Sequence, residues 1–147
     1  MQQAGLVRHL GISAVVPAQL AQARQIAPVV CVQNSYAVGA ASERHEFMRE
    51  CGALGVAFVP FFAIAGRGRE SGVGRTIRPR RPSRSSRRAH RATAAQIRLA
   101  WTLAPGPHVL AIPGTGNLEH LDGNVAAAAI RLTEDERAQL ESVVSAA

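Results

Sequence analysis

The sequence predicts an α/β fold in which parallel strands alternate with helices. Short apolar runs recur along the chain, and each is followed, directly or after a loop, by a stretch with helical periodicity or a helix-capping signal. The runs are apolar on both faces, which is typical of parallel strands joined by right-handed crossovers. The chain has 147 residues and is 47% hydrophobic, so we expect one domain over residues 1–147 with a buried core.

The first strand–helix unit lies near the start of the sequence. A short strand is expected within residues 6–13. Pro17 is then expected to begin a helix, because proline suits the first helical turn. In that helix Leu20, Ala23 and Ile26 recur at helical spacing and predict an inward face.

The second unit begins with a β-branched run at residues 29–33, which predicts a strand. Ser42 is expected to be the N-cap of the following helix, since its hydroxyl can accept a hydrogen bond from the first turn. Gly52 and Gly55 are expected to end that helix. Its predicted inward face consists of Phe47, Cys51 and Leu54.

The third unit is interrupted by an unusual segment. Residues 56–64 predict a buried strand, but residues 67–91 are rich in Arg, Gly, Ser and Pro and have no apolar period. We expect this segment to be a disordered or irregular loop within the domain. Order is expected again at Thr93, which begins a capping box with Gln96. The helix that follows has an apolar stripe of Ile97, Ala100, Trp101 and Ala104.

The fourth unit contains the clearest candidate for a ligand site. A strand is expected at residues 108–112, followed by a glycine-rich turn at 114–116 and a helix that starts at Asn117. Free N–H groups and the positive end of the helix dipole suit a phosphate, and glycine lets the backbone approach it closely. An ordinary turn that binds no ligand is the alternative.

A last helix is expected to begin with the capping box from Thr133 to Glu136 and to turn Leu140, Val143 and Val144 inward. The four strand–helix units amount to half of an eightfold (β/α)8 TIM barrel. In such barrels ligands bind at the carboxyl ends of the strands, and phosphate commonly binds near the last two strands and a short extra helix. This context favours the phosphate interpretation of the glycine-rich turn.

The charge pattern argues against nucleic acid as a partner. Ten of the 17 arginines lie in residues 67–91 beside one acid, whereas elsewhere seven arginines face nine acids, so the net charge of +7 belongs to one segment. No apolar run approaches the roughly 18 residues that span a bilayer, and no signal peptide is evident, so a cytoplasmic location is expected. Cys31 and Cys51 are expected to be buried free thiols, and no residues have metal-ligand spacing.

Five blocks of the sequence resemble the C-terminal half of aldo-keto reductases. In chain order they are GLVRHLGIS, VVCVQNSYAV, FVPFFAIAG, ATAAQIRLAWTLAP and VLAIPGTGNLEHLDGNVAAAAIRLTEDE. The resemblance covers almost the whole chain except residues 67–88, and it implies roughly the last four β/α units of a TIM barrel. It also implies a reductase of aldehydes and ketones that uses NADPH. A shifted reading frame over residues 67–88 is our hypothesis for the departure there, and the nucleotide sequence would test it.

The resemblance implies a set of cofactor-binding residues. Ser13 and Gln33 match family residues that bind the nicotinamide carboxamide, and Phe61 matches an aromatic residue that stacks on the nicotinamide ring. The family asparagine beside the serine is replaced here by Ala14. The loop along the pyrophosphate would include Ala63, Ile64 and Gly66.

The adenosine end of the cofactor is expected at the fourth unit. Gly114 and Thr115 match positions at the 2′-phosphate, and Asn124 matches an asparagine at the adenine. His120 stands where the family commonly has an arginine. Because Gly114 and His120 replace two permanent cations, NADH is an alternative cofactor.

The resemblance does not extend to the catalytic residues. The family's tyrosine, lysine, aspartate and histidine belong to the other half of the barrel, and this sequence contains no lysine. Tyr36 does not match the catalytic tyrosine, and either lining the cofactor cleft or packing in the core is open to it. We therefore expect no catalytic residue here, and inactivity of the chain alone.

Two kinds of partner follow from these expectations. A small carbonyl substrate would bind once an N-terminal half completes the barrel, and exposed strand edges favour self-association. The alternative is a non-catalytic protein that binds partners through its basic segment.

Overall fold

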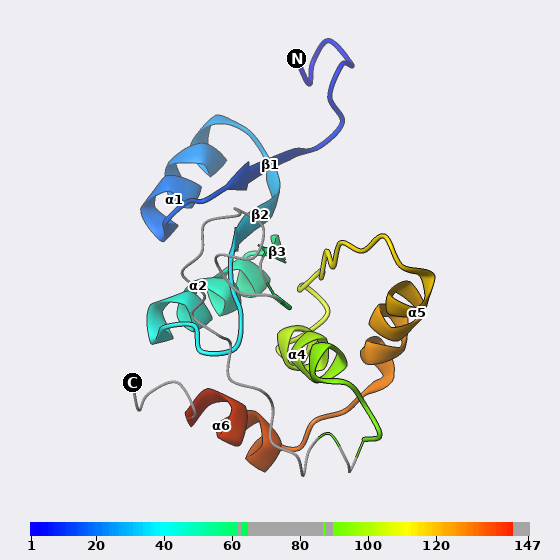
Figure 1. The fold of residues 1–147 in the computed structure, drawn as a ribbon. Helices are drawn as coiled ribbons and strands as arrows, with labels where there is room; N and C mark the ends of the chain where they lie inside the picture. Colours follow the sequence, from blue (N-terminus) through cyan, green and yellow to red (C-terminus); the bar gives the residue numbers. More distant parts are fainter. Residues whose placement is uncertain (62, 65–86, 88–89, 143–147) are drawn as a thin grey trace, which may run out of the picture.

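The computed structural model describes residues 1–61, 63–64, 87 and 90–142, and it has the predicted alternation of strands and helices (Figure 1). The elements are β1 (Leu10–Ser13), α1 (Pro17–Ile26), β2 (Val29–Ser35), α2 (Ser42–Ala53), β3 (Ala57–Phe61), α4 (Ala94–Leu103), α5 (Leu118–Ala126), the 3-10 helix η1 (Ala127–Ala129) and α6 (Glu134–Ser142).

The sheet is parallel and its strands follow chain order, β1-β2-β3. The predicted fourth strand is reduced to one parallel bridge between Val109 and Phe58. Two backbone bonds hold it there: Phe58 N–H donates to the His108 oxygen at 2.7 Å, and Leu110 N–H donates to the Phe58 oxygen at 2.9 Å. The parallel α/β class is therefore confirmed, while the fourth strand is shorter than predicted.

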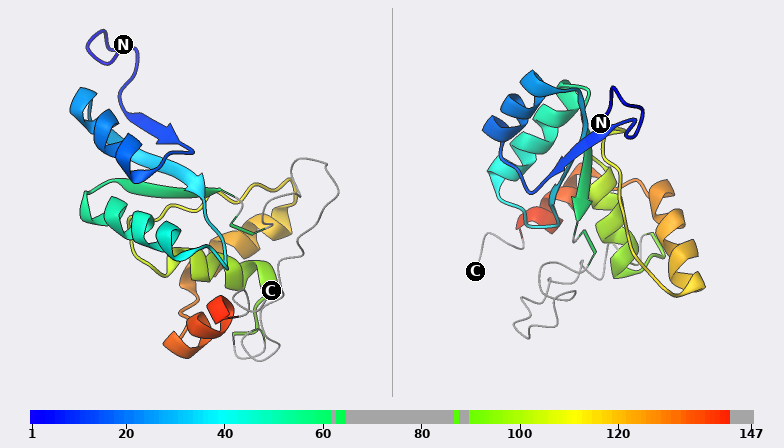
Figure 2. Two further views of the ribbon diagram at one scale, coloured as in Figure 1. Left: turned by 90° about the vertical axis from the view of Figure 1, so that its left-hand side faces the viewer. Right: turned by 90° about the horizontal axis from the view of Figure 1, so that it is seen from above.

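One core lies between the sheet and the helices. Helices α1 and α2 lie along the same side of the sheet, as the two views in Figure 2 show. Val32 of β2 and Phe58 of β3 pair in register and are almost fully buried. The helices α1, α2, α4 and α6 each contribute buried residues to that core cluster, namely Leu20, Phe47, Met48, Cys51, Ile97, Trp101 and Leu140.

Several predicted boundaries and faces are wrong in detail. The first strand begins at Leu10, and the N-cap of α2 is Ala41, which leaves Ser42 as its first helical residue. Ile26 is 87% exposed because it is the last residue of α1, beyond the part of the helix that packs on the sheet through Leu20. Leu54 and Ala104 also lie at helix ends and are exposed.

Both predicted capping boxes are confirmed. The Thr93 hydroxyl accepts a hydrogen bond from the Gln96 N–H at 3.2 Å, and the Gln96 side chain accepts from the Thr93 N–H at 2.8 Å. At α6 the Thr133 hydroxyl accepts from the Glu136 N–H at 3.2 Å, and Glu136 accepts from the Thr133 N–H at 3.0 Å. Each box pairs N–H groups that the first helical turn leaves without partners.

Glu136 also joins the start of α6 to the residues that precede α4. Its two carboxylate oxygens each lie 3.0 Å from the Nε2 atom of His90. Partial burial tends to raise the pKa of Glu136, but hydrogen bonds from His90 and Thr133, with the charge of His90, outweigh it and lower the pKa. The ionised carboxylate is thus the form that the fold prefers.

We predict that this carboxylate makes folding sensitive to acid. A group whose pKa is lower in the folded state stabilises the fold above its ordinary pKa and loses that contribution as the pH falls through the folded pKa. Glu136→Gln should therefore flatten the acid limb of a plot of unfolding free energy against pH, by less than about 1 kcal/mol because the pair is partly exposed. Urea unfolding at stepped pH would measure this.

The matched control is Glu134→Gln, because Glu134 lies in the same helical turn and its side chain is 94% exposed. It shares the interaction with the helix dipole but does not contact His90. Equal flattening by both substitutions would contradict the assignment to the His90–Glu136 contact.

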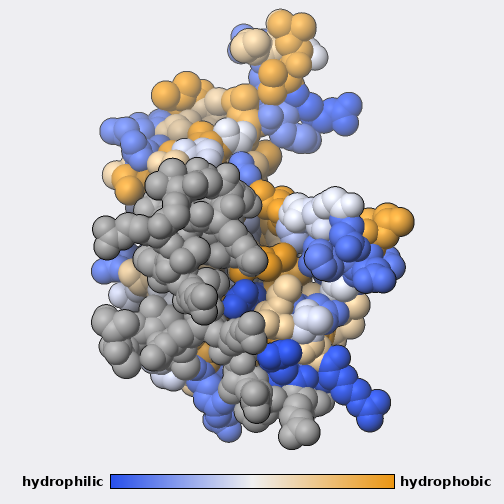
Figure 3. Space-filling model, in the orientation of Figure 1, coloured by the Kyte–Doolittle hydropathy of each residue, from blue (hydrophilic) through white to orange (hydrophobic). Residues whose placement is uncertain are grey.

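Apolar side chains also remain on the surface. Apolar and polar surface alternate on the face that Figure 3 shows. Helix α5 has no buried residue, and its Leu118, Leu121 and Val125 are 79%, 48% and 69% exposed. Leu110 and Ile112, which lead toward that helix, are about half exposed. This part of the chain therefore presents unpartnered apolar side chains.

Some predictions lie outside the described residues. Of the basic segment 67–91, the structure describes Arg87, His90 and Arg91, and Val143 and Val144 are also outside it. Within the described ranges, no helix is long and apolar enough to cross a membrane. In those same ranges no group of His, Cys, Asp or Glu side chains could hold a metal ion.

Candidate functional site

Three predicted site residues lie on one face of the sheet, at the carboxyl ends of neighbouring strands. Ser13 pairs in register with Gln33, and Gln33 pairs with Val59, two residues before Phe61. Register partners in parallel strands share a face, and side chains two residues apart do so too. Val32 lies one residue before Gln33, and Phe58 lies three residues before Phe61, so both point to the opposite face of the sheet. There they belong to the core beneath the helices. The three predicted residues therefore face away from the helical layer.

The polar groups of this face suit the recognition of an amide. The Ser13 hydroxyl donates to the Gln33 backbone oxygen at 2.9 Å, so its remaining lone pairs can accept from a ligand. The half-buried Gln33 side chain has no hydrogen-bond partner among the described residues. An amide has both a donor and an acceptor, and it can bind the complementary groups of a carboxamide.

Asn34 fixes the loop that follows Ser13, a role that the sequence did not reveal. Its amide donates to the Val15 oxygen at 2.7 Å and accepts from the Val15 N–H at 3.0 Å. The Ala14 N–H donates to the Gln33 oxygen at 3.0 Å. The one available signal for this clamp was the polar residue directly after the strand predicted at residues 29–33. The clamp holds the chain around Ser13 in a defined conformation.

Ala14 occupies the left-handed region of the backbone, with φ of 56°. We predict that Ala14→Gly raises the free energy of unfolding by roughly 1 kcal/mol, because a Cβ atom is unfavourable at this φ. Ala14→Asn should stabilise somewhat less, since asparagine tolerates this region better than alanine. Thermal unfolding followed by circular dichroism would measure both variants.

Ala21→Gly provides the control for this prediction. Ala21 is exposed in the interior of α1, where glycine should destabilise by about 1 kcal/mol. Opposite signs at positions 14 and 21 would support backbone strain at Ala14, whereas destabilisation at both would contradict it.

The loop after β3 is tied to α4. Ala63 is buried, and the Ile64 oxygen accepts a hydrogen bond from the Arg98 guanidinium at 2.9 Å. Arg98 was not predicted as a site residue because it lies beside the apolar stripe of α4 and matches no motif. Gly66 lies outside the described residues. The described part of the predicted pyrophosphate loop is therefore anchored by its backbone.

The glycine-rich turn is exposed, and α5 begins after Asn117 as predicted. The expectation of free N–H groups is wrong for three residues. The Asn117 side chain accepts from the N–H groups of Glu119 and His120 at 2.8 and 3.4 Å, and the Thr115 hydroxyl accepts from the Asn117 N–H at 3.1 Å. The turn is thus capped by its own side chains, as helix starts commonly are.

The side chains predicted for the adenosine end gather around this turn. Gly114, Thr115 and His120 are exposed, and Asn124 is half-buried one helical turn beyond His120. Residues four apart share a face of a helix. His120 and Asn124 therefore lie on one side of α5, and Gly114 and Thr115 lie in the turn before it.

Tyr36 is a core residue and does not line the predicted cofactor face. Its side chain is 1% exposed and stacks on Trp101, with ring centroids 5.2 Å apart. Its hydroxyl lies 2.9 Å from the Nδ1 atom of His45. Burial, aided by the charge of Glu141, raises the pKa of Tyr36 well above its usual range. Packing is therefore the correct alternative for this residue.

The two cysteines differ from each other. Cys51 is fully buried, and burial, reinforced by Glu50, raises the pKa of its thiol to about 11. The prediction of burial is wrong for Cys31, which is half-buried because it points to the same face as Gln33. A Cβ atom on Gly11 would lie 2.5 Å from the Cys31 sulfur, so glycine at this position leaves room for the thiol. Both thiols are free.

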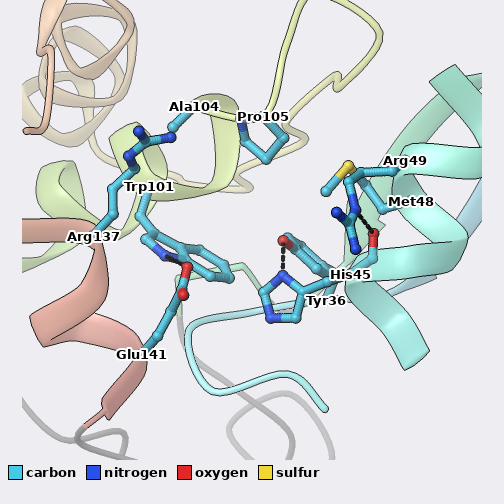
Figure 4. A pocket seen from close by; sticks show the side chains of 9 residues that line it. All are labelled: Tyr36, His45, Met48, Arg49, Trp101, Ala104, Pro105, Arg137 and Glu141. Atoms are coloured by element: carbon cyan, nitrogen blue, oxygen red, sulfur yellow. Dashed lines mark hydrogen bonds between the residues drawn. The ribbon is translucent and has the colours of Figure 1, made fainter. Parts of the chain in front are cut away.

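A separate pocket lies among α2, α4 and α6 (Figure 4). None of the predicted cofactor residues lines it. The lining side chains are aromatic, apolar and basic, with one carboxylate: Tyr36, His45, Met48, Arg49, Trp101, Ala104, Pro105, Arg137 and Glu141. The pocket therefore has a chemistry different from that of the sheet face.

Sequence comparisons support the resemblance. A model of the Aldo/keto reductase family matches residues 1–145. A pyridoxine 4-dehydrogenase of Escherichia coli is 40% identical over 149 residues, which cover 97% of this chain and 47% of that protein. An uncharacterized oxidoreductase of Schizosaccharomyces pombe is 33% identical over 142 residues, which cover 96% of this chain and 44% of that protein. The chain thus spans about half the length of the curated relatives it matches.

Solved structures have a similar fold. A thermostable aldo-keto reductase crystallised with the inhibitor epalrestat aligns with a TM-score of 0.79 and 31% identity, over 97% of this chain and 50% of that one. An aldo-keto reductase from Klebsiella pneumoniae, solved in complex with NADPH, aligns with a TM-score of 0.76 and 25% identity over the same shares. The described fold is therefore of the TIM-barrel type that these proteins share.

Proposed function

Because this chain belongs to the aldo/keto reductase family, we propose that it forms the cofactor-binding C-terminal half of an NADPH-dependent reductase of aldehydes and ketones. In this proposal the four strand–helix units are the last four of a (β/α)8 barrel. The family membership supports the oxidoreductase class. The arrangement of the sheet supports the assignment of cofactor binding to this half of the barrel.

One observation carries the proposal: Ser13, Gln33 and Phe61 share one face and one edge of the parallel sheet. Ligands of α/β barrels bind at the carboxyl ends of the strands. The resemblance assigns these three residues to the nicotinamide, although they come from three different strands. A chance match of motifs would not require them to converge on one face.

The residues present fit NADPH at its nicotinamide end. The unpartnered amide of Gln33 and the Ser13 hydroxyl would hold the carboxamide, and the Phe61 ring at the end of β3 would lie against the nicotinamide. The Asn34 clamp on Val15 would keep Ser13 in place. When bound, NADPH supplies a hydride to the carbonyl carbon of the substrate.

The rest of the cofactor would follow the loops after the last two strands. Ala63, Ile64 and Gly66 would lie along the pyrophosphate. The adenosine would reach Gly114, Thr115, His120 and Asn124, with NADH as the alternative because no permanent cation stands among these four residues.

The described residues bind the cofactor in this proposal but do not protonate the substrate. Reduction of a carbonyl needs a proton donor beside the developing alkoxide. The chain has no lysine, and the Tyr36 hydroxyl is buried against His45, away from the sheet face. We therefore infer that the proton donor and much of the carbonyl-substrate pocket belong to the other four units, and that the chain is inactive without them.

The exposed apolar side chains support association with those units. Leu110 and Ile112 directly follow the bridge between Val109 and Phe58, and the exposed apolar residues of α5 come next in the chain. The other half of the barrel, or a second copy of this chain, would cover them.

Calorimetric titration with NADPH tests the proposal, with NADH alongside. We expect saturable binding that Gln33→Ala weakens about tenfold, because the loss of one or two hydrogen bonds is worth roughly 1–1.5 kcal/mol. Gln25→Ala is the matched control, because Gln25 is an exposed glutamine of α1 on the other side of the sheet. Absence of binding to a chain that melts cooperatively, or equal binding by both variants, would contradict the proposal.

Ala14→Asn offers a gain-of-function test of the same site. The family asparagine at this position would add a carboxamide contact, so NADPH should bind severalfold more tightly. Ala14→Gly relieves the same backbone strain without adding that contact, and it should leave the affinity nearly unchanged.

A further inference from the structure

The pocket among α2, α4 and α6 is built on an aromatic cluster. Tyr36 stacks on Trp101, and the His45 ring meets both of them edge to face. The two larger rings are at most 2% exposed, so they form a rigid base whose edges reach the pocket. Met48, Ala104 and Pro105 complete the apolar wall. The pocket can therefore accommodate a flat apolar group.

Most of the polar atoms around the pocket already have partners. The Tyr36 hydroxyl lies 2.9 Å from His45 Nδ1, and His45 Nε2 lies 3.2 Å from the Ala40 oxygen. The indole N–H of Trp101 donates to Glu141 at 3.1 Å. These bonds leave neither the aromatic hydroxyl nor the indole N–H to bind a ligand.

The groups that remain are guanidinium donors. The Arg137 Nε is buried and has no hydrogen-bond partner in the described structure. Arg49 donates through its Nε to the His45 oxygen at 3.4 Å, and no bond of its terminal nitrogens lies within the described residues. Figure 4 shows the two arginines on opposite sides of the pocket, with the Trp101 and Tyr36 rings between them. A ligand would have to supply hydrogen-bond acceptors to these guanidinium groups.

Nearby carboxylates reduce the positive charge without cancelling it. Glu141 lines the pocket and is bonded to Trp101, and Glu134 lies 3.8 Å from the Arg137 guanidinium with a side chain that is 94% exposed. An exposed ion pair at that distance is weak. Two arginines therefore face one lining carboxylate, and the pocket favours an anion.

We propose that this pocket binds a small organic anion with a flat apolar body, of the aryl carboxylate class. The carboxylate accepts hydrogen bonds from Arg137, whose buried Nε has no partner in the described structure, and the aromatic ring lies against Trp101, Met48 and Pro105. Arg49, on the opposite side of the pocket, adds to its positive charge. Planar guanidinium groups suit carboxylates, and their bonds to an anion are stronger than bonds between neutral groups. The site is separate from the sheet face, so it does not rest on NADPH binding.

Trp101 allows a direct test, because it is the single tryptophan of the sequence and lines the pocket. Benzoate is the probe, titrated to about 20 mM while the tryptophan emission is recorded. Benzyl alcohol tests the need for charge, because it has a similar shape but is neutral. Inorganic phosphate tests whether an oxyanion binds without the apolar body.

We expect benzoate to change the emission saturably, with a dissociation constant near 1 mM or below. Arg137→Gln should weaken its binding about tenfold, and Arg49→Gln should weaken it by a smaller factor. Arg24→Gln, an exposed arginine of α1, should have no effect. Benzyl alcohol and phosphate should each bind at least tenfold more weakly than benzoate.

The proposal would be overturned by no saturation with benzoate, by equal binding of benzyl alcohol, or by unchanged binding of benzoate to both folded pocket variants. Circular dichroism identifies a variant that fails to fold, and the other arginine variant then decides. Phosphate binding as tight as benzoate would also overturn it, since the apolar body would then contribute nothing.

Discussion

Trp101→Ala is expected to lower the free energy of unfolding by about 3–5 kcal/mol, which is typical of truncating a large buried aromatic side chain. The Trp101 side chain is 2% exposed, stacks on Tyr36 and donates its indole N–H to Glu141. The substitution removes the contact by which α4 supports both the end of β2 and helix α6. Far-ultraviolet circular dichroism should record a melting temperature lower by roughly 10 °C.

Two milder variants separate the contributions to this loss. Trp101→Phe keeps an aromatic ring beside Tyr36 but removes the bond to Glu141, and Tyr36→Phe removes only the hydroxyl that contacts His45. A single hydrogen bond contributes roughly 1 kcal/mol, so Tyr36→Phe should have a much smaller effect than Trp101→Ala. If Trp101→Ala melted with the wild-type midpoint, the aromatic cluster would not be part of the cooperative core.

This aromatic cluster also shows what the sequence could not predict. The Ile97, Ala100 and Trp101 stripe was evident from helical spacing, and the structure confirms that all three are buried. Spacing does not indicate which residue a buried side chain meets, and Tyr36 and Trp101 are far apart in the chain. The sequence therefore allows two roles for Tyr36, and its packing against Trp101 decides between them.

The two capping boxes were predicted correctly because they depend only on residues close together in the chain, although the N-cap predicted at Ser42 lies one residue too late. Ile26 fits the helical period as well as Leu20 does, yet it is exposed because it is the last residue of α1, beyond the part of the helix that packs on the sheet. The strand predicted at residues 108–112 is too long for a similar reason, because strand length depends on pairing with a neighbour. Here the pairing with β3 is the single bridge between Val109 and Phe58.

The candidate cofactor face rests on both the sequence resemblance and the strand register. Ser13, Gln33 and Phe61 were selected by resemblance, and the strand register brings them to one face. Asn34 was missed as the clamp on Val15, because the clamp depends on the path of the loop after β1. The resemblance thus selected candidate ligand contacts, but it did not reveal Asn34, which holds the chain beside Ser13 in position.

Gly52→Ala is expected to destabilise the fold by about 1–3 kcal/mol, although alanine normally favours a helix interior. Helix α2 ends at Ala53, between Gly52 and Gly55 as predicted, and Gly52 lies in its last turn against the His108 ring. A Cβ atom at Gly52 would lie 2.9 Å from three atoms of that ring. The ring cannot withdraw easily, because His108 Nε2 contacts the Met48 sulfur at 3.3 Å and the His108 oxygen accepts from the Phe58 N–H.

Gly123→Ala in α5 is the matched control, because a Cβ atom there would meet only the Gln96 side chain, at 3.8 Å and beyond. It should stabilise the helix by roughly 0.5–1 kcal/mol, which is the ordinary gain from replacing helical glycine. Urea unfolding of both variants would therefore give shifts of opposite sign. Adding His108→Ala to Gly52→Ala should recover part of the loss, because it removes the clash. Stabilisation by Gly52→Ala alone would contradict the close packing of α2 against the chain before Val109.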